Sequence, residues 1–313
     1  MKIPNCLWMQ ISAMRVVEEY FKDSIRYIKY STPLRREMLR SIAGKNLEAQ
    51  ITKDYHRIEK GLSLPSPKRP FGADATSRLK LALSNKSLSR TQPEDDYTRF
   101  AHDAMESLSR FNSTAEIDDL VSPKLEDIGS PNLSHQDVAT FFETRRSVRN
   151  FDPSASIPTE VIREATRLAG LSPSVCNRQS CKTYYFAGRR NIDRILKHQA
   201  GNRGFGHTAQ GIFVVTSDMQ MFGGSGERNQ SWIDGGLFAM SLVLALHGLG
   251  VGTCMLNWSK RNKASRFLRA EASIPDNENV IALIAVGYPD KNARVARSPR
   301  RAIENILSIQ EGE

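Results

Sequence analysis

The stretch WIDGGLFAMSLVLALHGLGVGTCMLN, residues 232–257, governs how the second half of the chain folds. No Asp, Glu, Lys or Arg occurs from Gly235 to Ser259, so this segment belongs in a protein core or in a membrane. A membrane-spanning helix needs about 20 uninterrupted apolar residues, whereas glycines at 248, 250 and 252 break this one. We therefore expect a buried core helix from about Trp232 to His247 and no transmembrane segment.

Strand-like and helix-like segments alternate around this core helix. KTYYFAG (182–188), QGIFVVTS (210–217) and NVIALIAVGYP (279–289) are short runs rich in β-branched and aromatic residues, as strands are. TEVIREATRLAG (159–170) places apolar residues at helical spacing directly after Pro158. Helices interleaved with strands predict a layered domain of helices and sheet.

Residues 1–135 differ from residues 136–313 and are expected to form a mainly helical extension with an acidic linker at its end. Apolar residues recur at helical spacing from Arg15 to Tyr30, and a second helix is expected from about Leu34 to Lys60. An isolated amphipathic helix cannot bury its own apolar face. We therefore expect the apolar positions of the first helix to pack on the body; these are Val16, Val17, Tyr20, Phe21, Ile25 and Ile28.

Composition and charge exclude several classes of protein. The net charge of +10 over 313 residues is divided among a basic head, an acidic middle and a mildly basic body. Blocks of charge of this kind are typical of solvated faces and linkers. No zinc-finger spacing or basic zipper accompanies it, so a nucleic-acid partner is not expected. The four cysteines form no CxxC pair and no Cys/His cluster. Together with a first segment unlike a signal peptide, this predicts a cytoplasmic protein without a metal site.

Three clusters along the chain carry candidate chemistry: RRSVR (145–149), SPSVCNRQ (172–179) and RSPRR (297–301). Guanidinium groups together with a hydroxyl suit a phosphate monoester, which accepts several charge-assisted hydrogen bonds. Asn and Gln amides both donate and accept, which suits the ring edge of a flavin or a base. Each cluster taken alone is also compatible with an ordinary solvated basic run.

In this order the clusters resemble the nitroreductase family of flavin-dependent oxidoreductases. The pattern is RxSxR, SPSxxNxQ, a glycine-broken apolar helix, GYP and a basic tail, over about residues 138–308. The resemblance implies an α+β fold of three layers, in which a mixed, largely antiparallel sheet is flanked by helices. It also implies a homodimer with flavin mononucleotide (FMN) at the subunit interface.

The resemblance also assigns roles to residues of this chain. Arg145, Ser147 and Arg149 match the motif that holds the phosphate and ribityl end of FMN, and Arg146 occupies a variable place within it. Ser174, Asn177 and Gln179 match the motif that reaches the flavin of the partner subunit. The remaining expected cofactor contacts are the C-terminal pair Arg300 and Arg301, the loop residue Asn202, and a turn near flavin N5 at Thr253–Asn257, which contains Met255, Leu256 and Asn257.

Two parts of the sequence depart from the compact members of this family. Ser180 and Cys181 stand where many members have Pro-Trp. The leader YHRIEKGLSLPSPKRPFG (55–72) is similar to one in a subgroup of larger nitroreductase-like proteins, associated with bacterial polysaccharide biosynthesis loci. The segment GGSGERNQ (223–230) is expected either to cap the core helix or to face the substrate.

The expected function is an FMN-dependent oxidoreductase that passes electrons from NAD(P)H to a nitroaromatic or quinone-like small molecule by a ping-pong mechanism. The flavin supplies the redox chemistry, so no side chain is singled out as a catalytic acid or base. The alternative is a flavin-binding accessory protein without turnover, because the long head could cover the nicotinamide site.

Overall fold

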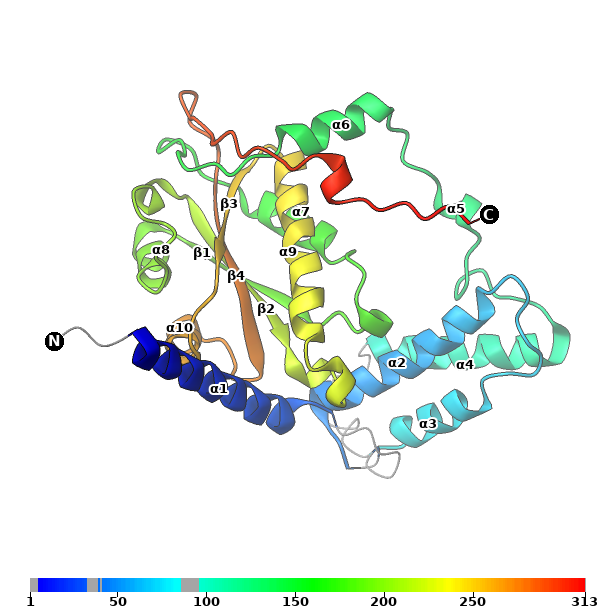
Figure 1. Cartoon of the computed structure of the whole chain (residues 1–313). Coiled ribbons are helices and arrows are strands. Elements are labelled where there is room, and N and C mark those ends of the chain that lie inside the picture. Colours follow the sequence, from blue (N-terminus) through cyan, green and yellow to red (C-terminus); the bar gives the residue numbers. More distant parts are fainter. Residues whose placement is uncertain (1–4, 33–38, 40, 86–95, 313) are drawn as a thin grey trace.

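The computed structural model describes residues 5–32, 39, 41–85 and 96–312 (Figure 1). Its sheet has four strands in the order β1-β2-β4-β3, and each neighbouring pair is antiparallel. The strands are β1 (Cys181–Ala187), β2 (Gly211–Asp218), β3 (Gly252–Asn257) and β4 (Glu278–Gly287). Strands β1 and β3 are therefore the two edges, and β4 is hydrogen-bonded on both sides.

Helices cover both faces of the sheet. On one face lie α7 (Thr159–Ala169) and α9 (Gln230–Gly248), and on the other lie α8 (Arg189–Leu196) and α10 (Asn262–Ala272). Side chains alternate along a strand, so Phe213 of β2 packs toward α7 and α9, while Ile212 packs toward α8 and α10. The expected α+β architecture of three layers is confirmed.

The predicted core helix is α9. Among the described residues, the segment Ser225–Gly248 is the one helical stretch long and apolar enough to cross a membrane by length and composition. The buried residues of α9, such as Phe238, Leu242 and Leu246, pack against α7 and the sheet in one hydrophobic cluster. In this fold α9 serves as a core helix.

The head has a hydrophobic core of its own. Helices α2 (Gly44–Leu62), α3 (Ala73–Leu83) and α4 (Asp96–Thr114) share one buried cluster. Helix α2 begins at Gly44, ten residues later than expected, and residues 33–38 and 40 lie outside the described part. Helix α4 lies in the acidic middle of the chain, where no particular helix was expected. Its buried residues, Ala101, Ala104, Leu108 and Phe111, recur at helical spacing and are the signal that would have predicted it.

Helix α1 (Asn5–Tyr30) packs on the body with its polar side, which contradicts the expectation from sequence. Arg26 donates to Asn279 Oδ1 at 2.9 Å and to the carbonyl of Asp276 at 2.7 Å, and Glu19 accepts from the backbone N–H of Asn262 at 2.7 Å. Asp276 and Asn279 lie at the start of β4. Asn262 begins α10, where the first backbone N–H groups of a helix have no partner within it. The six apolar positions predicted to face the body are all at least half exposed: Val16, Val17, Tyr20, Phe21, Ile25 and Ile28.

Two short helices and an extended tail complete the chain. Helices α5 (Leu125–Ile128) and α6 (His135–Thr144) connect the head to the body, and Ser134 and Asp137 form a capping box at the start of α6. After β4 the chain crosses above α9 and runs toward α5 (Figure 1). The described part of this tail contains a turn at 290–293 and the short 3₁₀ helix η7 (Ile303–Asn305).

Close contact between α9 and β4 yields a test of the fold. A Cβ atom at Gly235 would lie 2.5 Å from Cγ1 of Ile281, a side chain that is stiff because it branches at Cβ. We predict that Gly235→Ala destabilises the protein by about 1–3 kcal/mol, as overpacking does, although alanine favours a helix. Urea unfolding measures this change.

The matched control is Gly248→Ala at the end of the same helix. Its Cβ would lie 3.5 Å from the Phe141 ring, which is an ordinary contact. Its stability should remain within about 0.5 kcal/mol of the wild type, as is usual at exposed positions. Equal stabilities of the two variants would contradict the packing of α9 on β4.

Candidate functional site

The first basic cluster is fixed to the edge strand β3. Ser147 forms a parallel bridge with Thr253, and the backbone N–H of Val148 donates to the Thr253 carbonyl at 2.9 Å. Arg149 is exposed and its guanidinium interacts with Cys254, while Arg145 and Arg146 are half-buried. The prediction of a turn at residues 253–257 is wrong, because these residues pair with β4 as a regular strand.

The two faces of β3 have different surroundings. Met255 and Asn257 are exposed, whereas Cys254 and Leu256 are buried in the cluster that α8 and α10 cover. The side chains of Met255 and Asn257 are therefore available to a ligand, and Leu256 can offer only its backbone. Burial raises the pKa of the Cys254 thiol, which favours a packing role for this residue.

The loop that carries Asn202 is tied to the end of β3. Gln199 Nε2 donates to the carbonyl of Asn257 at 2.7 Å. Asn202 itself is half-buried, and its side-chain Oδ1 is buried without a hydrogen-bond partner. An unpaired buried acceptor is costly unless a donor reaches it. The flavin pyrimidine edge carries an N–H donor of the type that fits here.

The second cluster lies just before β1 and is held by hydrogen bonds within its own loop. The backbone N–H of Gln179 donates to Ser174 Oγ at 3.0 Å, and Gln179 Nε2 donates to the carbonyl of Asn177 at 3.3 Å. A 3₁₀ turn, η3 (Val175–Asn177), forms the middle of the loop. Gln179 is exposed, and Ser174 and Asn177 are half-buried, so all three can contact a ligand.

The sheet keeps the first and second clusters far apart within one chain. Thr253 of β3 pairs with Val286 of β4, whereas Cys181 of β1 pairs with Ser217, which in turn pairs with Asn279 of β4. Val286 and Asn279, the β4 residues level with the first and second clusters, are separated by about 24 Å along β4. The two edge strands are separated by about 14 Å across the sheet. One chain therefore does not bring both clusters to the same end of one small ligand.

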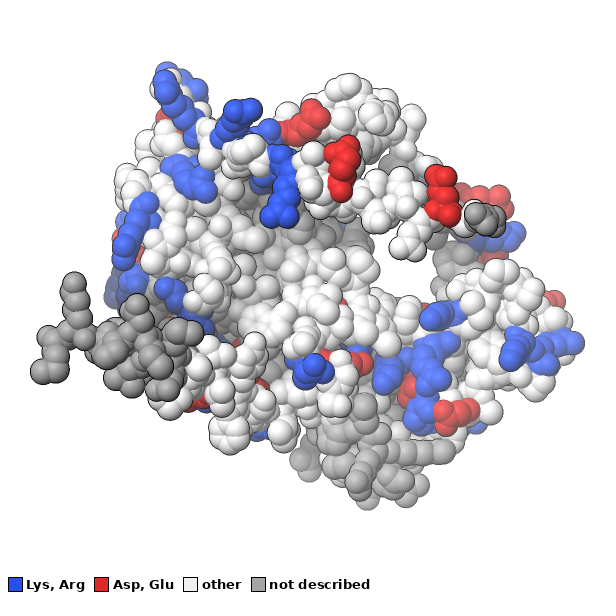
Figure 2. Space-filling model, viewed as in Figure 1, with Lys and Arg blue, Asp and Glu red and all other residues white. Residues whose placement is uncertain are grey.

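The third cluster lies on the C-terminal tail. Arg300 and Arg301 are exposed, and Arg300 donates to the carbonyl of Ser298 at 2.9 Å. Lys and Arg side chains gather at the upper edge of the face shown in Figure 2, over the end of α6 and the upper part of β3. None of the hydrogen bonds or ion pairs among the described residues ties Arg300 or Arg301 to the first cluster.

Sequence reasoning missed one buried ion pair at the second cluster, that of Arg178 with Glu227. Arg178 is a buried cation within the second cluster, and it forms a bidentate ion pair with Glu227. Glu227 therefore does not cap α9, whose N-cap position is Asn229, and the expectation that this segment faces the substrate stays a prediction. Arg178 is the one charged residue of the loop 172–179, and this was the available signal, but its partner lies 49 positions away.

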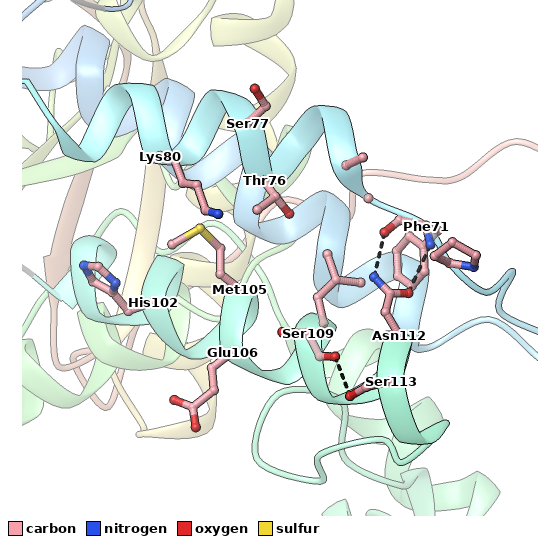
Figure 3. A pocket seen from close by; sticks show the side chains of 14 residues that line it. Phe71, Thr76, Ser77, Lys80, His102, Met105, Glu106, Ser109, Asn112 and Ser113 are labelled. Carbon is pink, nitrogen blue, oxygen red and sulfur yellow. Dashed lines mark hydrogen bonds between the residues drawn. The ribbon is translucent and has the colours of Figure 1, made fainter.

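Two further cavities lie outside these clusters. One, of about 820 Å³, lies between α1 and the loop before α9, and Tyr27, Arg228 and Trp232 are among its lining residues. The other, of about 1000 Å³, lies between α3 and α4 in the head (Figure 3). In the head cavity Asn112 exchanges two hydrogen bonds with the backbone of Phe71. Figure 1 places α3 and α4 at the opposite side of the molecule from β3, so the head cavity is not part of the candidate site.

Comparisons with known proteins indicate one family for the body of the chain. The sequence profile of the nitroreductase family matches residues 142–202 and 193–288. An Archaeoglobus fulgidus protein, provisionally named NADH dehydrogenase/NAD(P)H nitroreductase, is 29% identical over 150 residues, which are 47% of this chain and 82% of that protein. Iodotyrosine deiodinase from Nematostella vectensis is 22% identical over 231 residues, which are 64% of this chain and 86% of that protein.

A solved structure shows the same fold. A Bacillus subtilis protein described as a nitroreductase has a TM-score of 0.51 and 18% identity, and the match covers 56% of this chain and all of that one. Residues 142–288, just under half of the chain, match the nitroreductase family, and the match supports membership of this family. The resemblance expected from the sequence motifs is confirmed, while the link to polysaccharide biosynthesis loci stays a prediction.

Proposed function

We propose that this protein is an FMN-dependent oxidoreductase that takes electrons from NAD(P)H and passes them to a small aromatic acceptor in two separate half-reactions. The observation that carries the proposal is the convergence of Arg145–Arg149, the exposed side of β3 and the unpaired Asn202 amide at one sheet edge. Exposed guanidinium groups suit the phosphate of FMN, and an acceptor oxygen suits its ring edge.

Each group at this edge has a defined task. Arg145, Ser147 and Arg149 bind the phosphate and ribityl end, and Asn202 accepts a hydrogen bond from the ring. The backbone and the exposed side chains of Met255 and Asn257 line the ring. When bound, FMN supplies the electron-transfer chemistry itself. The protein contributes binding, orientation and the exclusion of water.

The proposal includes a homodimer, because the second cluster must reach a flavin held by another chain. The separation of the two clusters across the sheet supports this. A row of exposed apolar residues on α9, Trp232, Ile233, Leu237 and Met240, also supports it. Figure 2 shows few charged side chains over this part of the face. Exposed apolar patches of this kind mark interaction surfaces.

The acceptor is proposed only as a class. Nitroaromatics and quinones are the first candidates to assay. One relative carries the name iodotyrosine deiodinase, so a halogenated aromatic ring belongs in the same set. No side chain of the site is assigned as a general acid.

Anaerobic reduction separates an enzyme from an accessory flavin protein. We predict that the purified protein is yellow and that NADH or NADPH bleaches its visible flavin absorbance in the absence of oxygen. Addition of an acceptor should restore the colour. A yellow protein that neither nicotinamide bleaches would favour the alternative in which the head blocks access and no turnover occurs.

The C-terminal arginines provide a test of where the phosphate binds. We predict that Arg300→Ala/Arg301→Ala weakens FMN binding by about tenfold to a thousandfold, because a hydrogen bond to a charged group contributes about 1.5–3 kcal/mol. Quenching of FMN fluorescence during titration of the apoprotein measures the affinity.

A charge-matched control is Lys260→Ala/Arg266→Ala, which removes two exposed cations outside the three clusters. This variant should bind FMN as the wild type does. Full FMN occupancy of the Arg300→Ala/Arg301→Ala protein after dialysis would show that the phosphate lies elsewhere.

A further inference from the structure

The loop of the second cluster has a backbone conformation that its residues rarely adopt. Cys176, Asn177 and Gln179 have φ values of 51°, 52° and 49°, which lie in the left-handed region. None of them is glycine, and only Asn visits this region with any ease. Such a conformation persists when the surroundings fix it, and it is concentrated at functional sites.

A buried ion pair fixes this loop from inside. The Arg178 side chain is fully buried, and its two terminal nitrogens donate to Glu227 at 2.9 and 2.8 Å. Its Nε donates to the carbonyl of Val175 at 3.1 Å, and the guanidinium lies over the Phe222 ring at 5.5 Å. Arg178 therefore links both ends of the 3₁₀ turn to the segment before α9.

The Glu227 carboxylate is itself fixed by a further hydrogen bond. Its Oε2 also accepts from the backbone N–H of Gly223 at 2.7 Å. Burial alone would raise the pKa of Glu227, but the hydrogen bonds from Arg178 and Gly223 lower it below its ordinary value. The carboxyl group is thus charged at neutral pH, and the pair is a true ion pair. A second, weaker anchor is Asp234 of α9, whose Oδ2 accepts from the backbone N–H of Val175 at 3.3 Å.

The head supports the same ion pair from the other side. Phe222 is fully buried in a small cluster with Met221 and with Ala49 of α2. The backbone N–H of Thr32, just after α1, donates to the Phe222 carbonyl at 2.7 Å, and Asn46 of α2 donates to the Gln220 carbonyl at 3.1 Å. The segment from Gln220 to Glu227 therefore lies between the head and the loop of the second cluster.

We propose that Arg178 and Glu227 are positioning residues that hold the loop 174–179 in its left-handed form and so present Asn177 and Gln179 to the cofactor. The head takes part by fixing Phe222 beneath the Arg178 guanidinium. The identity of the cofactor rests on the proposed function, whereas the holding of the loop does not. The loop is preorganised before the cofactor arrives, which lowers the ordering cost of binding.

Two variants separate positioning from simple stabilisation. Arg178→Met keeps an unbranched apolar side chain in place of the aliphatic stem of Arg178 but removes the guanidinium group. It strands the half-buried Glu227 carboxylate, so both stability and FMN affinity should fall. Arg178→Met/Glu227→Gln removes both charges, so the melting temperature should return most of the way to that of the wild type. We expect this double variant still to bind FMN at least tenfold more weakly. Its amides at 175–179 should exchange hydrogen at least tenfold faster in the apoprotein.

The matched control is Arg167→Met, which breaks another bidentate Arg–Glu pair, with Glu164, on the exposed surface of α7. It should leave melting temperature, FMN affinity and loop exchange unchanged. If affinity and loop exchange both return to wild-type values in the double variant, the pair only stabilises the fold and the proposal is overturned. If the wild type binds no FMN, the proposed function fails, and loop exchange alone then supports or overturns the positioning role.

Discussion

Strand β4 is hydrogen-bonded to β2 on one side and to β3 on the other, and this double pairing sets the geometry of the whole candidate site. Nearly every residue of β4 is buried, because helices cover both faces of the sheet. The strand therefore places β1 and β3 at opposite edges. The cluster before β1 and the cluster bound to β3 cannot approach each other within one chain, and a site that uses both must be shared between chains.

Arginines of this protein act in two different environments. Arg178 is fully buried, is paired bidentately with Glu227 and lies over the Phe222 ring. Its charge is therefore neutralised by a partner inside the protein and does not reach a ligand. Arg149, Arg300 and Arg301 are exposed, and apart from the contacts of Arg149 with Cys254 and of Arg300 with the Ser298 carbonyl their donors remain available to an anion. A buried charge needs its partner because desolvation is costly, whereas an exposed cluster gains most when a phosphate binds it. The first environment shapes a loop, and the second can bind a ligand.

The sequence predicted the parts of the fold that depend on local periodicity. The strands at 181–187, 211–218 and 278–287 and the helices α7 and α9 were expected within a few residues. The edge strand β3 was expected to be a turn, since its partner is chosen by tertiary pairing with β4. The predicted orientation of α1, with its apolar side on the body, was wrong for a similar reason. Hydrogen-bonding groups at the starts of β4 and α10 draw its polar side inward, and no local pattern reveals them.

Site residues were easier to propose than their arrangement. Motif spacing singled out Arg145, Ser147 and Asn177, and the structure places all three at half-buried positions near the two sheet edges. The ion pair of Arg178 with Glu227 was missed because it joins segments that are 49 residues apart. The roles of the predicted residues toward FMN stay predictions until binding is measured.

A heterodimer of two variants tests most directly whether each site is shared between two chains. One chain carries Arg145→Ala/Arg149→Ala and the other carries Asn177→Ala/Gln179→Ala, with different affinity tags for purification of the mixed species. In a symmetric dimer the mixed species has one intact site and one doubly defective site. We predict that it retains about half of the wild-type FMN content, while each variant homodimer retains little. A heterodimer with as little FMN as the homodimers would contradict the shared site.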